Sequence, residues 1–239
     1  MNSVVKEDRV NIAIVIKEGV KAAWPICLGY FPIGFAFGIL AQKAGLRPLE
    51  ITLMSILVFA GSSQFIAISM LSSEAALFSI VAATFMVNLR HVLMSSSLAI
   101  YLRHTSRSFL SLFSYGVTDE SFAVNLTKFM EGHWHRYQGL MVNQVSNAVW
   151  IGSTLVGGYG GEFIPAGAFG LDYALIAMFL CLIVFQLRGR FHIITAIVAS
   201  VLAILLTILI PGNAYVIIAS SLAATIGFAL QRYVHRKGK

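Results

Sequence analysis

Phe59-Ala-Gly-Ser-Ser-Gln-Phe65 lies in the middle of an apolar stretch that has no charged residue from Ile51 to Leu71. A second apolar stretch, from Ala75 to Tyr101, is interrupted in the same way by Asn88-Leu-Arg-His91. Hydrocarbon offers no hydrogen-bond partner, and an arginine at the centre of a membrane helix costs about 2.5–3.5 kcal/mol on translocon scales. Polar groups at this depth therefore predict a place where a polar solute binds or crosses.

The composition predicts an integral membrane protein. Of the 239 residues, 58% are hydrophobic and 11% are charged, and the mean hydropathy is +0.82, whereas soluble domains contain about 25% charged residues. The net charge of +7 would also suit a nucleic-acid-binding protein. The basic residues, however, gather at the chain ends and between apolar segments, as the positive-inside rule expects. We therefore expect membrane lipid around the chain and no nucleic acid.

Helices are the expected spanning elements because every backbone polar group has to be satisfied within the bilayer. A span needs about 20 mostly apolar residues. The candidate segments are 22–42, 51–72, 75–102, 108–128, 138–157, 172–187, 191–210 and 213–231. The predicted fold class is an all-α, polytopic membrane bundle of about eight helical segments, some of them broken or re-entrant. It forms one domain over residues 1–239, with an amphipathic lead-in at 1–20 and a basic tail at 232–239.

The distribution of lysine and arginine predicts that both chain ends lie in the cytoplasm. The basic residues of the two ends are Lys6, Arg9, Lys17, Lys21, Arg232, Arg236, Lys237 and Lys239. Eight simple crossings would put four further basic residues outside, namely Lys43, Arg47, Arg103 and Arg107. All four would lie inside if segments 22–42 and 108–128 were re-entrant or broken. Prolines and glycines in the first segment, and Asp119-Glu120 in the second, make both candidates for discontinuous helices, which build binding sites in transporters.

Polar residues recur at helical spacing in four segments. The four sets are Thr84, Asn88, His91 and Ser95; Ser55, Ser62 and Ser69; Ser114, Thr118, Ser121 and Asn125; and Asn143, Asn147, Trp150 and Thr154. Residues at these spacings share one face of a helix, and a polar face is unfavourable against lipid. The faces are predicted to converge on a polar path or central site. Ordinary packing through small hydroxyl residues is the alternative.

Gly61-Ser62-Ser63-Gln64 combines a conformationally free glycine with serines, which favour helix starts. A helix that begins here would direct its backbone N–H groups toward a carboxylate. A kinked but continuous helix is the alternative.

Ionisable side chains lie deep in the predicted spans. Arg90 would pair with Asp119 or Glu120, or would contact the carboxylate of a substrate. An unperturbed histidine titrates near neutral pH, and burial and mutual repulsion favour the protonated form of adjacent carboxylates. His91, Asp119 and Glu120 are therefore the candidates for proton coupling, with packing or a structural ion pair as the alternative roles.

The sequence contains no motif for catalysis or for metal binding. Cys27 and Cys181 stand singly in apolar segments, and His133-Trp-His135 has no third ligand nearby. Neither a GxSxG nor an HExxH motif occurs. We therefore expect no enzyme activity, no cofactor and no metal site.

Several longer motifs resemble the AzlC family over residues 20–231. They are Pro32-Ile-Gly-Phe-Ala-Phe-Gly38, Met54-Ser-Ile-Leu-Val-Phe-Ala-Gly-Ser-Ser-Gln64, Asn88-Leu-Arg-His91 with Met94-Ser-Ser-Ser-Leu98, Thr118-Asp-Glu-Ser-Phe122 and Gly170-Leu-Asp-Tyr-Ala174. The resemblance implies the large subunit of a branched-chain amino acid exporter in the bacterial inner membrane. It also implies a small AzlD-type membrane protein as partner.

The residues and the resemblance together predict secondary active export of valine, leucine and isoleucine, with methionine as a further candidate. No ATP-binding motif is present, so an ion or proton gradient would drive export. The residues predicted to hold the charged groups of the substrate are Ser62, Ser63, Gln64, Asn88, Arg90 and Asn147. An apolar pocket would come from Phe35, Phe37, Phe59, Phe65 and Met94. The alternative is a passive channel, or a permease for another small amphipathic solute.

Overall fold

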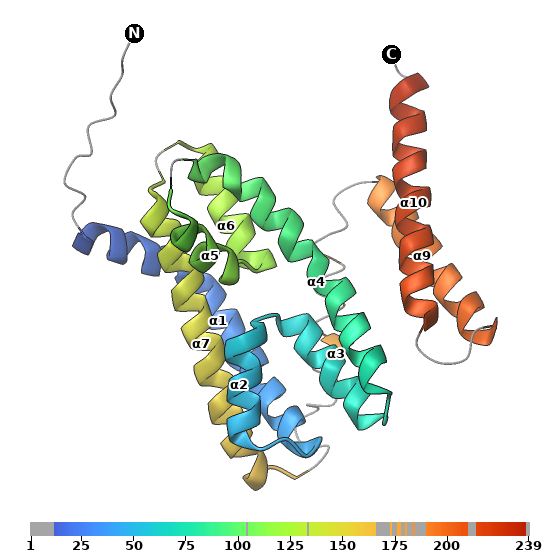
Figure 1. The fold of residues 1–239 in the computed structure, drawn as a ribbon, viewed down its shortest axis with the longest axis horizontal. Coiled ribbons are helices and arrows are strands. Elements are labelled where there is room, and N and C mark those ends of the chain that lie inside the picture. The colour runs from blue at the N-terminus through green and yellow to red at the C-terminus, as the bar shows by residue number, and fades with distance from the viewer. Residues whose placement is uncertain are drawn as a thin grey trace.

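The computed structural model describes residues 12–103, 105–132 and 134–165, the helices 190–209 and 214–237, and single positions at 173, 176, 177, 180 and 184. In these residues the chain is helical, without strands (Figure 1). The elements are α1 (Ile12–Lys43), α2 (Pro48–Val58), α3 (Gly61–Ser72), α4 (Leu77–Ala99), η1 (Ile100–Leu102), α5 (Arg107–Tyr115), α6 (Asp119–Met130), α7 (Arg136–Gly160), η2 (Gly161–Phe163), α9 (Arg190–Leu209) and α10 (Ala214–Lys237). The all-α prediction is confirmed, whereas the count of about eight segments is not.

Helix α1 is continuous even though Pro25 and Pro32 lie inside it. The prediction that segment 22–42 is broken or re-entrant is therefore wrong. Each proline removes one backbone hydrogen bond, but α1 packs along α7 over most of its length, and this contact keeps it in one piece. The described part of the predicted lead-in, residues 12–20, forms the first turns of α1.

The contact between α1 and α7 depends on glycine. A Cβ atom at Gly38 would lie 2.2 Å from the carbonyl oxygen of Thr154 and 2.6 Å from the backbone nitrogen of Gly158. Both are backbone atoms, so neither can move without moving the helix. Close approach of this kind is what small residues provide between membrane helices.

We expect Gly38→Ala to lower the stability of the protein by about 1–3 kcal/mol, the usual effect of overpacking. Gly29→Ala is the matched control in the same helix, because no atom lies within 4 Å of its added methyl group. Thermal unfolding in detergent measures both variants. Equal midpoints for the two would contradict the close packing of α1 on α7.

Segment 51–72 is divided into two helices. Helix α2 ends at Val58, Phe59 has a left-handed conformation with φ of 38°, and α3 begins at Gly61. The amide of Gln64 donates to Ser55 Oγ at 3.2 Å, although residues nine apart in a straight helix are separated by about 13 Å along the axis. α3 therefore turns back beside α2. The expected helix start at Gly61 is confirmed.

Segment 108–128 is divided in the same way, which confirms that it is discontinuous. Helix α5 ends at Tyr115 and α6 begins at Asp119. The side chain of Asn143 on α7 bonds both arms: its Nδ2 donates to the carbonyl oxygen of Phe113 at 2.9 Å, and its Oδ1 accepts from Asn125 Nδ2 at 2.9 Å. α5 and α6 therefore form a second hairpin.

We expect Asn143→Leu to cost about 2 kcal/mol, because it removes two buried hydrogen bonds worth about 1 kcal/mol each. Gln144→Leu is the control: it removes one longer bond, to the carbonyl oxygen of Leu112 at 3.3 Å, from a partly exposed side chain. Protection of the amides of α5 and α6 from hydrogen exchange should fall in the first variant and not in the second. Unchanged exchange in Asn143→Leu would show that the hairpin does not depend on this residue.

The two hairpins enter the bundle from opposite ends. Along α2, Ile51 packs at Gly158 and Ser55 bonds Thr154 at 2.9 Å, and Gly61 at the start of α3 faces Trp150. The hairpin α2–α3 thus reaches from the C-terminal end of α7 to its middle. The hairpin α5–α6 bonds α7 at Asn143 and Asn147, so it comes from the N-terminal end. Hairpin α2–α3 follows the long helix α1 in the chain, and hairpin α5–α6 follows the long helix α4. The two helix–hairpin units enter from opposite ends, an inverted arrangement known from secondary transporters.

Charge differs between the two ends. The N-terminal ends of α1, α5 and α7 and the C-terminal ends of α4 and α6 lie at one end of the bundle and carry an excess of basic residues, and we call this the basic end. Its charged residues are Lys17, Glu18, Lys21, Arg103, Arg107, Lys128, Glu131 and Arg136. The opposite end carries Lys43, Arg47, Glu50, Glu74 and Glu162. Re-entry of segment 108–128 places Arg103 and Arg107 with the N-terminal lysines, whereas Lys43 and Arg47 lie at the other end.

By length and composition, α1 and α4 are the two described helices that are long and apolar enough to cross a membrane. The apolar side chains of α4 are largely exposed, with Phe78 and Leu93 at 82% and 71%, as expected of a helix in contact with lipid. α9 and α10 pair with each other (Figure 1), and α10 touches α4. α10 continues to Lys237, so the described part of the predicted basic tail is helical. Segment 172–187 lies mostly outside the described residues.

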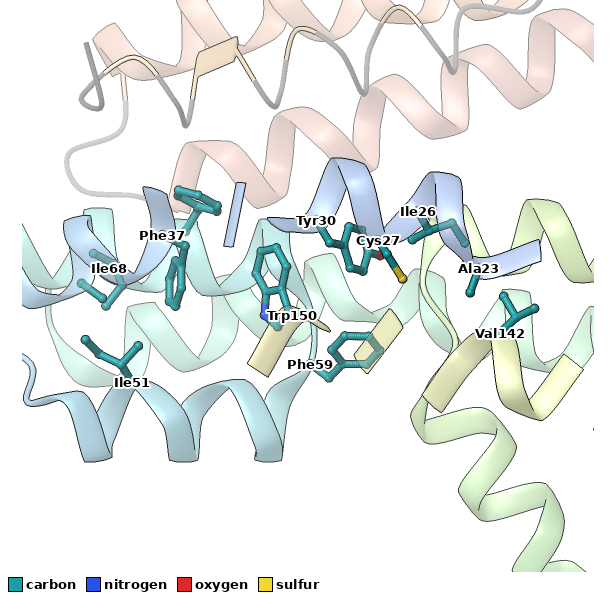
Figure 2. Packing of buried hydrophobic residues seen from close by; sticks show 12 residues of the cluster. Ala23, Ile26, Cys27, Tyr30, Phe37, Ile51, Phe59, Ile68, Val142 and Trp150 are labelled. Atoms are coloured by element: carbon teal, nitrogen blue, oxygen red, sulfur yellow. The ribbon is translucent and has the colours of Figure 1, made fainter. Parts of the chain in front are cut away.

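The main apolar core lies between α1, α2, α3 and α7. Tyr30 packs edge-on against Trp150, and Phe37 stacks on the same indole (Figure 2). Phe37 also meets Phe65 edge-on. Phe59, at the turn of the first hairpin, is 2% exposed. These aromatic residues fix the turn of α2–α3 against the middle of α1 and α7.

Candidate functional site

The turns of the two hairpins meet around a small central cavity of about 50 Å³. It lies near the middle of α1, α4 and α7, the depth at which a polar group is most costly in a bilayer. The residues that line it are Tyr30, Ile33, Phe59, Ala60, Gly61, Ser62, Arg90, His91, Thr118, Asp119, Glu120 and Trp150.

Two helix N-termini face the cavity. Helix α6 is capped by its own residues: Thr118 Oγ1 accepts from the backbone N–H of Ser121 at 3.3 Å, and Ser121 Oγ accepts from the N–H of Thr118 at 2.9 Å. Helix α3 begins after Ala60, whose methyl group offers no acceptor to the first turn. The N-terminus of α3 therefore adds uncapped positive dipole to the cavity.

Arg90 joins the two turns from α4. Its Nη2 donates to Ser62 Oγ at 2.6 Å and lies 2.9 Å from Asp119 Oδ2. Its Nε is buried and has no partner among the described residues. Of the roles that the sequence left open, the structure shows the ion pair with Asp119. The buried Nε–H of the guanidinium group therefore remains for a further acceptor.

The two adjacent carboxylates have different partners. Asp119 binds Arg90, whereas Glu120 Oε2 accepts from the hydroxyl of Tyr30 at 2.6 Å. The same hydroxyl lies 2.7 Å from Thr118 Oγ1. Glu120 has no basic partner within ion-pair distance among the described residues. Its negative charge is available to a cation, and Tyr30 holds the carboxylate in place.

Four of the six predicted binding residues lie outside the cavity lining, and two of these, Gln64 and Asn147, bond side chains of other helices. The amide of Gln64 bonds Ser55 and accepts from Trp150 Nε1 at 3.0 Å. Ser63 Oγ donates to the carbonyl oxygen of Ala60 at 3.0 Å. Asn147 Nδ2 donates to the hydroxyl of Tyr115 at 3.3 Å. The contacts of Gln64 and Asn147 favour a role in holding the hairpins, whereas Ser63 bonds the residue that precedes its own helix.

Asn88 lies on α4 two residues before Arg90, and its Oδ1 is buried without a partner among the described residues. It does not line the cavity. His91 lines the cavity together with Arg90, and it also faces a larger groove toward the basic end. Of the predicted residues, Ser62, Arg90, His91, Asp119 and Glu120 are thus brought together.

Sequence reasoning did not select Tyr30 as a site residue. It stands in an apolar segment without a recognisable pattern, and its importance arises from the contact with Glu120 across 90 positions of the chain. Thr118 and Trp150 were expected on polar faces but without a role in binding. Thr118 lies at the turn of α5–α6, and Trp150 lies beside the turn of α2–α3. The spacing of residues in the sequence could not predict these positions, because the chain reverses direction in both hairpins.

No metal site is recognised: among the described residues, no three His, Cys, Asp or Glu side chains are grouped to hold a metal ion. His133 lies outside the described residues. His135 begins α7, where Tyr137 N donates to its Nδ1 at 3.4 Å. Partial burial and the neighbouring Arg136 lower the pKa of His135 below its ordinary value. It takes no part in the central cavity.

The cavity has the properties required for a small zwitterion. Arg90 and the start of α3 are positive, Glu120 is negative, and the walls between them come from Ile33, Phe59 and Trp150. An apolar amino acid needs both kinds of charge and an apolar wall. As described, the cavity has room for only a few water molecules, so it must widen to admit such a ligand.

Comparison with known proteins identifies relatives over most of the chain. A family model described as AzlC protein matches residues 25–164. The chain is 29% identical to the inner membrane protein YgaZ of Escherichia coli (strain K12) over 198 residues, 79% of this chain and 81% of that protein. It is 31% identical to an uncharacterized membrane protein of Archaeoglobus fulgidus over 193 residues, 80% and 84% of the two chains.

A third relative is the branched-chain amino acid transport protein AzlC of Bacillus subtilis (strain 168), 28% identical over 197 residues, which cover 81% of this chain and 76% of that protein. No solved structure matches the chain. The stretch matched by the family model extends from α1 to just beyond η2 and therefore contains both hairpins and the central cavity.

Proposed function

Because the chain belongs to the AzlC family of membrane transport proteins, we propose that it exports branched-chain amino acids from the cytoplasm. Valine, leucine and isoleucine are the proposed substrates, with methionine as a further one. A gradient of protons or other ions would drive export, and a small AzlD-type membrane protein would be the partner subunit. The bacterial inner membrane is the proposed location.

The observation that carries the proposal is the separation of charge around Arg90. The substrate carboxylate would approach the free donor of Arg90, Ser62 and the N-terminus of α3. The substrate ammonium group would bind Glu120, which Tyr30 orients. The branched side chain would contact Ile33, Phe59 and Trp150. Discontinuous helices that meet at mid-membrane are the usual setting for such a site.

Counterflow in proteoliposomes tests the proposal. Vesicles loaded with unlabelled valine, leucine, isoleucine or methionine should accumulate labelled leucine transiently, and vesicles loaded with glutamate should not. The assay is run for this chain alone and together with the small subunit. Absence of counterflow for every branched-chain amino acid in both preparations would overturn the proposed substrate.

A passive channel is the second candidate, since the cavity is small and polar on one side. A channel would conduct without saturation and without accumulation against a gradient. Counterflow and saturation kinetics in the same vesicles decide between the two. The paired charges of Arg90 with Asp119 favour a binding site over an open pore.

We expect the basic end to face the cytoplasm, because lysine and arginine are retained there by the positive-inside rule. A reporter enzyme that is active only in the periplasm, such as an alkaline phosphatase, should be inactive when it is fused at Lys239. In a background without Cys27 and Cys181, Glu131→Cys should react with an impermeant thiol reagent only after cells are opened, and Ser73→Cys should react in intact spheroplasts. The reverse pattern of labelling would invert the proposed orientation.

A further inference from the structure

A second hollow, the α4–α5 groove, lies between these two helices and has a volume of about 550 Å³. Its lining residues are His91, Val92, Ser95, Ser96, Ala99, Leu102, Leu110, Ser114 and Tyr115. On α4 these residues begin at the middle of the helix and continue to its C-terminus, so the groove extends from the depth of Arg90 to the basic end.

The groove and the central cavity share a wall. His91 lines both, and Tyr115 closes the inner end of the groove beside the turn of the first hairpin. The Tyr115 ring lies 6.2 Å from that of Phe59, a residue of the cavity, and its hydroxyl donates to the carbonyl oxygen of Ile56. His91 and Tyr115 therefore separate the two spaces.

Size and lining suit a small amphipathic solute. Ligand pockets commonly have volumes of about 300–1,000 Å³, a range that includes the groove and excludes the central cavity. Hydroxyl groups from Ser95, Ser96 and Ser114 alternate with apolar side chains such as Leu102 and Leu110. The side-chain hydroxyls of Ser95 and Ser114 have no hydrogen-bond partner within the described residues, so both are available to water or ligand.

On the side of the central cavity that faces away from the basic end, the bundle is closed. Between the central cavity and the opposite end lie the stacked rings of Phe37 and Trp150 (Figure 2), with Phe65 against Phe37. Phe37 and Phe65 are at most 2% exposed. The two sides of the central cavity are therefore unequal: an open groove leads toward the basic end, and packed aromatic residues fill the way out of the other end.

We propose that the α4–α5 groove is the aqueous vestibule through which amino acid substrates reach the central cavity from the cytoplasm, with His91 and Tyr115 as the partition between them. The structure then corresponds to a state that is open toward the cytoplasm and closed toward the outside. The direction and the substrate class rest on the proposed function, whereas the access route rests on the groove itself.

Thiol accessibility tests the route without depending on transport. In the background without Cys27 and Cys181, Ser95→Cys and Ser114→Cys are exposed to an impermeant methanethiosulfonate reagent in inside-out and right-side-out vesicles. Ser97→Cys is the matched control, because it stands on the same helix and lines neither space. Ser73→Cys and Glu131→Cys report which face of each vesicle preparation is exposed.

We expect Ser95→Cys and Ser114→Cys to react from the same side as Glu131→Cys, and Ser97→Cys to remain unmodified because it faces lipid. Leucine should slow the reaction at both groove positions, and glutamate should not. Reaction of the groove positions only from the side of Ser73→Cys would overturn the proposal. Failure of both groove positions to react from either side would also overturn it, because the groove would then be filled by lipid or protein.

The same experiment separates the route from the substrate. Modification from the side of Glu131→Cys without protection by any branched-chain amino acid supports the aqueous route and contradicts the proposed substrate class. Loss of the partition gives a second readout: His91→Ala should speed modification at Ser95→Cys in the presence of leucine, because bound substrate can then move past this position. An unchanged rate would show that His91 does not separate the two spaces.

Discussion

Export by an Arg90→Ala protein is expected to fall to the level of vesicles that lack the protein. The guanidinium group is the positive side chain in the central cavity, and it bonds Ser62 and Asp119. A charge-assisted hydrogen bond contributes about 1.5–3 kcal/mol, and each 1.4 kcal/mol is a factor of ten in an equilibrium constant. Loss of the contacts to the substrate carboxylate and to Ser62 should therefore reduce export by two or more orders of magnitude.

The substitution also leaves Asp119 without its partner, which alone could reduce folding. The double variant Arg90→Ala/Asp119→Asn removes that unpaired charge, so it should recover normal membrane abundance but not export. Arg90→Lys keeps a charge but lacks the planar fork that reaches two acceptors at once, and we expect it to retain only weak activity. Normal saturable export by Arg90→Ala at equal abundance would remove Arg90 from the site.

Two further variants compare a buried polar residue beside Arg90 with a residue at the end of α7. The sequence predicts that Asn88 holds a charged group of the substrate, and its Oδ1 is buried without a partner among the described residues, so Asn88→Ala should also reduce export. The His135→Ala protein should export normally, because this side chain only caps the N-terminus of α7. A loss of export in His135→Ala equal to that in Asn88→Ala would contradict the central position of the site.

Much of the site could be predicted because burial of polar groups in a membrane is costly. Gly61, Ser62, Arg90, Asp119 and Glu120 stand out from their apolar surroundings in the sequence, and the structure places all of them at one cavity. The break before Gly61 followed from local chemistry, since glycine and serine favour a helix start. These are local signals, and they do not depend on how the chain folds back.

The parts that could not be predicted depend on tertiary contacts. Pro25 and Pro32 suggested a broken helix, but packing of α1 along α7 overrides that local preference. Spacing by threes and fours assumes a continuous helix, so it failed across both turns: Ser55 and Ser62 lie on different arms of one hairpin. Gln64 was expected to bind the substrate and Asn143 to face a polar path, whereas each binds the arms of a hairpin together.

The last expected result concerns energy coupling at the acidic pair. If protons drive export, one carboxylate at the cavity has to bind and release a proton in each cycle. Asp119 is occupied by Arg90, and Glu120 by Tyr30, so the two residues are suited to different steps. A substrate carboxylate that takes the place of Asp119 on Arg90 would free Asp119 to accept a proton, which links substrate binding to proton binding. Glu120, as the partner of the substrate ammonium group, would act in binding.

Asp119→Asn should therefore abolish accumulation against a gradient and leave exchange of internal for external leucine intact, because exchange needs no net proton movement. Glu120→Gln should weaken both activities, since it removes the negative partner of the ammonium group. The neutral variants keep the size of each side chain, and Glu131→Gln at the basic end is the control for a surface carboxylate. Both activities are measured in the same proteoliposomes with an imposed proton gradient. If Asp119→Asn still accumulates leucine against its gradient, Asp119 is not the coupling residue. Glu120 and His91, which also line the cavity, then become the candidates, and His91 in addition stands next to Arg90 and faces the groove.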